Sequence, residues 1–351
     1  AMTRAIVFAV FLAAVAYAAP RHDVSFTEAA LEAQTMVNYI NGLNTTWKAK
    51  LNEDSVGVPI ERRRKRNGVI GDRSKDQEMF ARQGILVEHS SINISIPVEF
   101  DANRHWPNCS DIIGRIRDQS DCGSCWTFST AEVISDRICI ATGQHVDISS
   151  NDILSCCGKS CGNGCDGGSP IMALHWYIKS GVVSGGGYYQ NNGCKPYPLK
   201  PCQHHAHTTN YTLPLCSPVE YPTPTCESSC AANYSSSYLA DKHYGKYAYG
   251  VKRNVEDIQK ELMINGPVSA AFTVYEDFEV YLGGIYQHKT GEELGGHAVK
   301  IVGWGSEGGV DYWIVNNSWN LSWGERGTFR MLRGSNECGI EQSIVAAWPN
   351  V

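Results

Sequence analysis

The distribution of cysteines constrains the fold of this chain more than any other feature. All 14 cysteines of the 351-residue sequence lie between Cys109 and Cys338, so the leading part of the chain carries none. The sequence is 42% hydrophobic, which is enough for a real core and excludes wholesale disorder. The formal net charge of -6, with both signs mixed along the chain, excludes nucleic acid as a partner.

The N-terminus indicates the compartment in which these cysteines fold. Thr3-Arg4 supplies a short basic start, residues 5–16 are uncharged and apolar, and Ala16-Tyr17-Ala18 suits signal peptidase. We therefore expect a signal peptide, with a buried N-terminal helix as the alternative. The run is shorter than the roughly 20 apolar residues of a membrane span, and no later stretch qualifies, so we expect no membrane anchor. A secretory protein meets an oxidising compartment, where most thiols pair.

The even cysteine count also bears on chemistry. If one of the 14 cysteines is kept free as a nucleophile, an odd number remains, so at least one further thiol is unpaired. A secreted enzyme with one reactive thiol is therefore expected to have two free cysteines.

The segment from Pro20 to about Ser95 is polar and partly helical. An amphipathic stripe predicts a helix that ends at Asn44-Thr45-Thr46; its residues are Ala29, Ala33, Val37 and Ile40. The five consecutive cations of residues 62–66 would repel one another in a compact element, so we expect an exposed loop. This basic run is either a proprotein-processing site or a plain solvated run, and the signal peptide excludes a nuclear-localisation signal.

Near Ile96-Pro97 the composition shifts toward cysteine, glycine and aromatic residues, which marks the main boundary. After it, apolar residues at helical spacing predict a helix packed into a core: Phe128, Ala131, Ile134 and Ile138. Three later segments predict strands: Ala298–Trp304, Tyr312–Val315 and Gly327–Leu332. Helices first and strands later favour an α+β fold with two subdomains.

Residues 194–230 form the least regular part of the sequence. The segment is dense in proline and cysteine, and it contains His204, His205 and His207. Proline removes donors from helices and from strand ladders, so we expect a long loop held by disulfides. Loops of this length inside a domain are usually functional or disordered.

The most specific motif is Cys-Gly-Ser-Cys-Trp at residues 122–126, which leads directly into the predicted helix. A thiol in the first turn of a helix lies at the positive end of the macrodipole, which favours the thiolate. This places Cys125 as a candidate nucleophile. The alternatives are half of a disulfide or, with Cys122, a redox pair.

A thiolate nucleophile needs an imidazole and a group that orients it. His297 is expected to open one strand and Asn317 to close the next. Because strands adjacent in sequence commonly pair, the two side chains are expected to meet.

With these motifs the chain resembles the papain family of cysteine proteases, and within it the cathepsin B group. The similarity extends from Met36-Val37-Asn38-Tyr39-Ile40 and Asn44-Thr45-Thr46-Trp47 to Cys338-Gly339-Ile340-Glu341. It implies a papain-like α+β fold in which an active-site cleft separates a helical subdomain from a β-barrel-like one, after a helical prosegment. The implied division is a signal peptide at 1–18, an inhibitory propeptide at 19–95 and a catalytic domain at 96–351, with residues 194–230 as its occluding-loop region.

The resemblance assigns roles to the candidate residues. Cys125 attacks the peptide carbonyl as thiolate, His297 protonates the leaving amine, and Asn317 holds the imidazole. The Gln119 amide and the Cys125 backbone N–H form the oxyanion hole. The residues implied to bind or shield substrate are Gly167 and Gly168 as a backbone platform, Trp319 over the histidine, Ser343 in the S2 pocket, and His204 and His205 in the occluding loop.

The resemblance also pairs the cysteines. The implied disulfides are Cys109–Cys139, Cys122–Cys165, Cys156–Cys226, Cys157–Cys161, Cys194–Cys230 and Cys202–Cys216. Cys125 and Cys338 are left over, in agreement with the parity argument. Zinc binding by Cys156, Cys157, Cys161 and Cys165 is the competing interpretation, which the secretory context and the absence of paired C-x-x-C motifs disfavour.

Histidines in an occluding loop would bind the C-terminal carboxylate of a substrate and make the enzyme a dipeptidyl carboxypeptidase. His207 has no counterpart in the family. Of the two ion pairs that latch this loop in the family, Asp118 and His204 retain one. The other is lost, because Ser322 replaces its acid and no arginine lies between Cys202 and Cys216. We therefore expect a looser loop and more endopeptidase activity.

Ser343 stands where cathepsin B has an acid at the floor of the S2 pocket. An arginine side chain at the substrate's P2 position would lie there unpaired, which is costly, so we expect preference for hydrophobic or aromatic P2 residues.

Further expectations concern partners and location. We expect protein and peptide substrates, the chain's own propeptide as inhibitor, cystatin-type inhibitors, no cofactor, no metal and a monomeric enzyme, secreted or lysosomal. Seven sequons permit glycosylation: Asn44, Asn93, Asn108, Asn210, Asn233, Asn316 and Asn320, of which we expect Asn316 to stay unmodified. The alternative function is a catalytically silent, disulfide-rich binding protein on the same fold, which the complete set of Gln119, Cys125, His297 and Asn317 argues against.

Overall fold

The computed structural model describes residues 22–52, 55–188, 190, 192–203, 213–214, 216–217, 219 and 221–351. The expected signal peptide and the three histidines of residues 204–207 lie outside these residues. The α-helices are α1 His22–Gly42, α2 Ile60–Lys65, α3 Asp76–Arg82, α4 Ala102–His105, α5 Ser110–Ile113, α6 Cys125–Thr142, α7 Ser150–Cys156, α8 Pro170–Ser180, α9 Val255–Asn265 and α10 Glu276–Glu279. Within the described part of the chain, no helix is long and apolar enough to cross a membrane.

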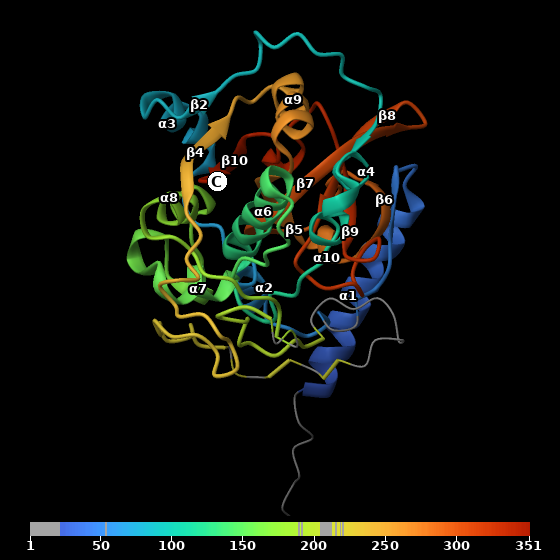
Figure 1. The fold of residues 1–351 in the computed structure, drawn as a ribbon. Helices are drawn as coiled ribbons and strands as arrows, with labels where there is room; N and C mark the ends of the chain where they lie inside the picture. The colour runs from blue at the N-terminus through green and yellow to red at the C-terminus, as the bar shows by residue number, and fades with distance from the viewer. Residues whose placement is uncertain are drawn as a thin grey trace, which may run out of the picture.

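One twisted sheet dominates the C-terminal half (Figure 1). Its strands are β1 Trp47–Ala49, β2 Leu86–Val87, β3 Phe100–Asp101, β4 Gly245–Val251, β5 Val268–Tyr275, β6 Tyr281–Tyr286, β7 Glu293–Glu307, β8 Val310–Asn316, β9 Thr328–Leu332 and β10 Ser343–Pro349. Over the described residues the order is β1-β6-β9-β8-β7-β5-β10-β4-β2, and β3 pairs with β7. The three strands predicted from the sequence are β7, β8 and β9, so the α+β prediction is confirmed.

Helix α6 lies between the sheet and helices α7 and α8 (Figure 1). Its predicted apolar stripe of Phe128, Ala131, Ile134 and Ile138 packs into the helical core. The opposite side of the same helix contributes Val133 and Cys139 to the sheet core. Because α6 is buried on both sides, it holds the two subdomains together, and its first turn lies between them.

The leading segment, which precedes residue 96, packs along the rest of the protein over much of its described length. Helix α1 covers the predicted stripe, buries Val37 and Ile40 in the sheet core, and ends at Gly42 as expected. Strand β1 pairs with β6 at one end of the sheet, and β2 pairs with β4 at the other. This segment therefore extends both edges of the sheet.

The basic run of residues 62–66 is not the exposed loop that we expected. Residues 60–65 form α2, and the arginines of the run form ion pairs with acids that lie after residue 96 in the sequence. Arg63 contacts Glu276 at 2.9 Å and Glu279 at 2.6 Å. The prediction was wrong because it considered only the repulsion among the cations. A carboxylate beside each arginine offsets that repulsion.

The described residues of the 194–230 segment contain no helix or strand. Two disulfides hold this region internally, Cys194–Cys230 and Cys202–Cys216. The other four are Cys109–Cys139, Cys122–Cys165, Cys156–Cys226 and Cys157–Cys161, so the six pairs are those that the resemblance implied. The free cysteines are Cys125 and Cys338. The four candidate zinc ligands all lie in disulfides, which leaves them no thiolate to bind metal.

Candidate active site

Cys125 is the first residue of α6, and its side chain is fully buried. The backbone N–H of Gly68 donates to its Sγ at 3.2 Å. Further backbone N–H groups, from Trp126 and Ala298, also point at the thiol. Ala298 follows His297 in β7, so the strand that carries the histidine lies against the nucleophile candidate.

His297 lies inside β7 rather than at its start, because the strand begins at Glu293. Strand β8 pairs with β7 and ends at Asn316, so Asn317 follows it directly. His297 Nε2 and Asn317 Oδ1 are 2.7 Å apart. The pairing of neighbouring strands thus brings the two predicted residues together.

Trp319 covers this pair: its ring centroid lies 4.8 Å from that of His297. Asn317 Oδ1 also accepts a hydrogen bond from the Ser318 backbone N–H at 2.8 Å, which fixes the amide orientation. The neighbouring Asn316 is 3% exposed and donates from its side chain to the Ile113 carbonyl, an unfavourable setting for a glycan.

The Gln119 side chain is held from both ends. Its Oε1 accepts from Ser318 Oγ at 2.7 Å, and its Nε2 donates to the Cys122 carbonyl at 2.8 Å and to the Arg66 carbonyl at 2.9 Å. Ser318 is a residue that the sequence reasoning missed, since only its position next to Asn317 distinguishes it.

A strand-like segment of the leading region runs across these residues. Gly68 N–H donates to Cys125, Val69 N–H donates to the Gly296 carbonyl at 2.8 Å, and Ile70 N–H donates to the Gly168 carbonyl at 3.2 Å. In return Gly168 N–H donates to the Gly68 carbonyl at 2.8 Å. A Cβ on Gly68 would lie 1.7 Å from the Gly123 carbonyl oxygen, so only glycine allows this approach.

Gly167 and Gly168 therefore meet an extended backbone, the task that the resemblance implies for them. A Cβ on Gly168 would lie 2.5 Å from the Trp126 ring. Here the extended chain is the leading segment of the protein itself.

Burial sets the charge of the candidate pair. It raises the pKa of Cys125 to about 11, although backbone N–H groups and Arg73 oppose the shift. Burial also lowers the pKa of His297 to about 4, against the hydrogen bond to Asn317. The macrodipole argument predicted a thiolate, but desolvation under the covering segment outweighs it. Both groups are neutral at physiological pH in this state.

Ser343 lies at the start of β10 and faces the leading segment. Its Oγ donates to Asp76 Oδ2 at 2.5 Å, and the preceding Gln342 donates to the Arg73 carbonyl at 2.7 Å. Among the described residues after residue 96, those that line the pocket around Ser343 are Ser169, Pro170, Ile171, Met172 and Val345, and none of them is acidic.

Only one partner of the ion pair that we expect to latch the 194–230 loop lies within the described residues. Asp118 accepts hydrogen bonds from the Ser120 backbone N–H and from Asn320, while its expected partner His204 lies outside the described residues. Ser322 is buried, and its backbone N–H donates to Asn320 Oδ1.

Comparison with known proteins gives a consistent result. Residues 96–348 match the model of the papain family cysteine proteases. Cathepsin B-like cysteine proteinase 4 of Caenorhabditis elegans is 46% identical over 321 residues, covering 91% of this chain and 92% of the relative. A cathepsin B-like cysteine proteinase of Schistosoma japonicum is 47% identical over 280 residues, covering 79% and 80%. The solved structure of procathepsin B S9 from Trypanosoma congolense superposes with a TM-score of 0.77 at 35% identity, covering 92% of this chain and all of that one.

Proposed function

The chain belongs to the papain family of cysteine proteases, and from this premise we propose that Cys125, His297, Asn317 and Gln119 are its catalytic residues. It is a cathepsin B-like cysteine peptidase, a hydrolase of peptide bonds. The observation that carries the assignment is the Arg66 carbonyl, which accepts a hydrogen bond from Gln119 Nε2 at 2.9 Å beside the Cys125 thiol. A peptide carbonyl can evidently occupy the place where an oxyanion would need a donor.

In the proposed reaction, Cys125 Sγ attacks the carbonyl carbon of the scissile bond. The oxyanion is stabilised by Gln119 Nε2 and the Cys125 backbone N–H at the start of α6. The His297 imidazolium gives its proton to the leaving amine as the C–N bond breaks, and the neutral imidazole then activates a water molecule that hydrolyses the thioester. Asn317 accepts from Nε2, which leaves Nδ1 available to take the proton of the thiol in the proposed reaction. Among described residues, Nδ1 has no hydrogen-bond partner, as expected before the ion pair forms.

We propose that residues 19–95 are an inhibitory propeptide and that the mature enzyme begins near Ile96, after an 18-residue signal peptide. Support comes from residues 66–70, whose backbone forms hydrogen bonds with Gln119, Cys125 and Gly168. Substrate and this stretch cannot share the cleft, so processing must precede activity.

We further propose dipeptidyl carboxypeptidase activity beside endopeptidase activity. The loop that would carry it is anchored by Cys202–Cys216, and the Gln203 N–H donates to the Pro214 carbonyl at 2.8 Å. Protonated His204 and His205 would bind the substrate's terminal carboxylate. Six disulfides support passage through the secretory pathway to a lysosomal or extracellular destination. Cystatin-type inhibitors and a monomeric state stay predictions.

Covalent labelling tests the catalytic assignment. After acid processing, a fluorescent iodoacetamide should label Cys125 rapidly and abolish peptide hydrolysis, whereas the intact zymogen should react slowly because its thiol is neutral and covered. Cys125→Ser reports the background from the other free thiol, Cys338, and His297→Ala should slow labelling by removing the imidazolium. A processed protein that labels at Cys125 but cleaves no peptide would instead favour the disulfide-rich binding protein.

A further inference from the structure

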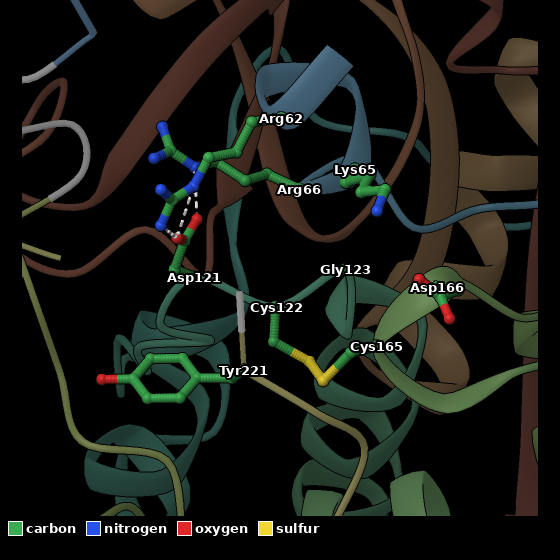
Figure 2. A pocket seen from close by; sticks show the side chains of 9 residues that line it. All are labelled: Arg62, Lys65, Arg66, Asp121, Cys122, Gly123, Cys165, Asp166 and Tyr221. Carbon is green, nitrogen blue, oxygen red and sulfur yellow. Dashed lines mark hydrogen bonds and ion pairs between the residues drawn. A yellow bond between two sulfur atoms is a disulfide. The ribbon is translucent and has the colours of Figure 1, made fainter. Parts of the chain in front are cut away.

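Asp121 is the acid on which the basic helix α2 converges. Figure 2 shows the Arg62 and Arg66 side chains pointing at its carboxylate, in a small pocket that also includes Gly123 and Cys165. Arg66 Nε donates to Oδ1 at 2.7 Å, and Arg62 Nε donates to Oδ2 at 3.0 Å. The carboxylate belongs to the catalytic unit and both guanidinium groups belong to the leading segment.

The carboxylate depends on these two cations. Every hydrogen bond that the described structure gives it comes from Arg62 or Arg66, and its side chain is 3% exposed. Burial alone would raise the pKa of Asp121, but Arg66 and Arg62 outweigh it and lower the pKa. When the leading segment is removed, Asp121 loses both partners, and a carboxylate in a cleft wall without a counter-ion favours any cation that can reach it.

The path of the leading segment shows which end of the cleft Asp121 flanks. After Gly68 the chain follows Gly168 and reaches Ser343, which lies in the S2 pocket under the proposed function. Before Gly68 it runs past Asp121, and Arg62 also donates to the Ser217 carbonyl in the 194–230 loop. Asp121 and Ser343 thus lie on opposite sides of Cys125. Asp121 is on the side that receives residues following the scissile bond.

We propose that Asp121 determines specificity by binding the guanidinium or ammonium group of a substrate residue on the C-terminal side of the scissile bond. The two arginines of α2 occupy that site until processing. This inference rests on the proposed function, because it assumes cleavage at Cys125. A charge-assisted hydrogen bond of this kind favours a cationic side chain by about tenfold or more over a neutral isostere.

The test uses the processed enzyme and two series of internally quenched peptides. The peptides in one series differ only at the first residue after the scissile bond, and those in the other only at the second. Each position carries arginine, lysine or citrulline, which is the neutral isostere of arginine. We expect kcat/KM for arginine to exceed that for citrulline by about tenfold in one of the series, and the ratio to fall to about 1 in Asp121→Asn.

Two further variants test whether the arginine preference comes from direct contact with the Asp121 carboxylate or from the general negative potential of the pocket. Asp166 lines the same pocket, but among the described residues no ion pair joins it to an arginine, so Asp166→Asn should keep the arginine preference. Asp121→Glu retains the charge and should keep it as well. An arginine-to-citrulline ratio near 1 in both series for the wild type, a ratio that Asp121→Asn leaves unchanged, or an equal loss in Asp166→Asn would overturn the proposal. Failure to cleave any peptide of either series would instead refute the proposed function beneath it.

Discussion

Individual side chains in this cleft owe their properties to what covers them. The same thiol and imidazole that would form an ion pair in an open cleft are neutral here, with pKa values of about 11 for Cys125 and about 4 for His297. Removing the cover restores solvent and lets the first turn of α6 favour the thiolate. Under the proposed function, the leading segment would thus suppress the nucleophile chemically as well as by blocking access.

Ser343 offers the clearest prediction at this scale. Ser343→Glu would place a carboxylate in an otherwise neutral pocket wall, so the ratio of kcat/KM for Arg-Arg over Phe-Arg fluorogenic dipeptides should rise about tenfold or more. Ser343→Gln, of equal size and no charge, should leave the ratio near that of the wild type. Equal turnover of the two substrates by the wild-type enzyme would contradict the role assigned to Ser343.

Helix α2 carries several adjacent positive charges that would repel one another in an isolated helix. Its arginines contact acids on both sides of the cleft, Asp121 on one and Glu276 with Glu279 on the other. Glu279 is 1% exposed and Arg63 donates to it from Nε at 2.7 Å. The helix therefore pairs with both walls of the cleft that it closes.

Arg63→Gln should consequently weaken the inhibition of the zymogen. It removes the charge-assisted hydrogen bonds from Arg63 to the buried Glu279, which weakens docking by about 2 kcal/mol, and conversion to the mature enzyme at fixed pH should become faster. Arg64→Gln is the matched control, because its pairs with Glu61 and Glu292 are exposed and worth little. Gel-resolved processing rates measure both, and equal rates for the two variants would argue against a buried clamp.

In the whole molecule, α6 joins the two subdomains, and buried charges cross that junction. Lys300 of β7 lies 2.9 Å from Asp136 and 3.8 Å from Glu132, both on α6, with none of these side chains more than 5% exposed. Burial raises the pKa of Glu132 from 4.5 to about 7, against the pull of Lys300 and Arg117, while Asp136 adds to the rise. This acid sits where the subdomains meet.

Glu132 should therefore destabilise the folded protein as the pH rises from 4.5 to 7. Over this range the unfolded chain releases the Glu132 proton and the folded chain keeps it, so this residue lowers the free energy of unfolding by about 3 kcal/mol, while His297, with its pKa lowered to about 4, acts in the opposite direction. In Glu132→Gln the change in the free energy of unfolding from pH 4.5 to pH 7 should therefore be more positive by about 3 kcal/mol than in the wild type. Denaturant melts at pH 4.5 and pH 7 measure the difference, and an identical pH dependence in both proteins would show that Glu132 does not titrate in this range.

Local patterns in the sequence predicted a large part of this protein. Helical spacing predicted α1 and α6, strand-rich segments predicted β7 to β9, and the family motifs named the six disulfide pairs together with Cys125, His297, Asn317 and Gln119. The predicted helices, strands and disulfide pairs are confirmed because apolar periodicity and short motifs are properties of neighbouring residues, whereas the catalytic roles of the four residues stay predictions. The exact start of β7, upstream of His297, needed the partner strands.

Only the tertiary structure decided which acids the basic run contacts and which charge state Cys125 and His297, the candidate catalytic pair, have. The charge of residues 62–66 is readable from the sequence, but the partners that make a helix of it are far away, with Asp121, Glu276 and Glu279 separated from it by tens to hundreds of residues. The macrodipole at Cys125 is likewise local, whereas the desolvation that outweighs it comes from Gly68 and its neighbours folded over the thiol. Charge pairing and burial depend on which distant segments meet, and a one-dimensional pattern does not contain that information.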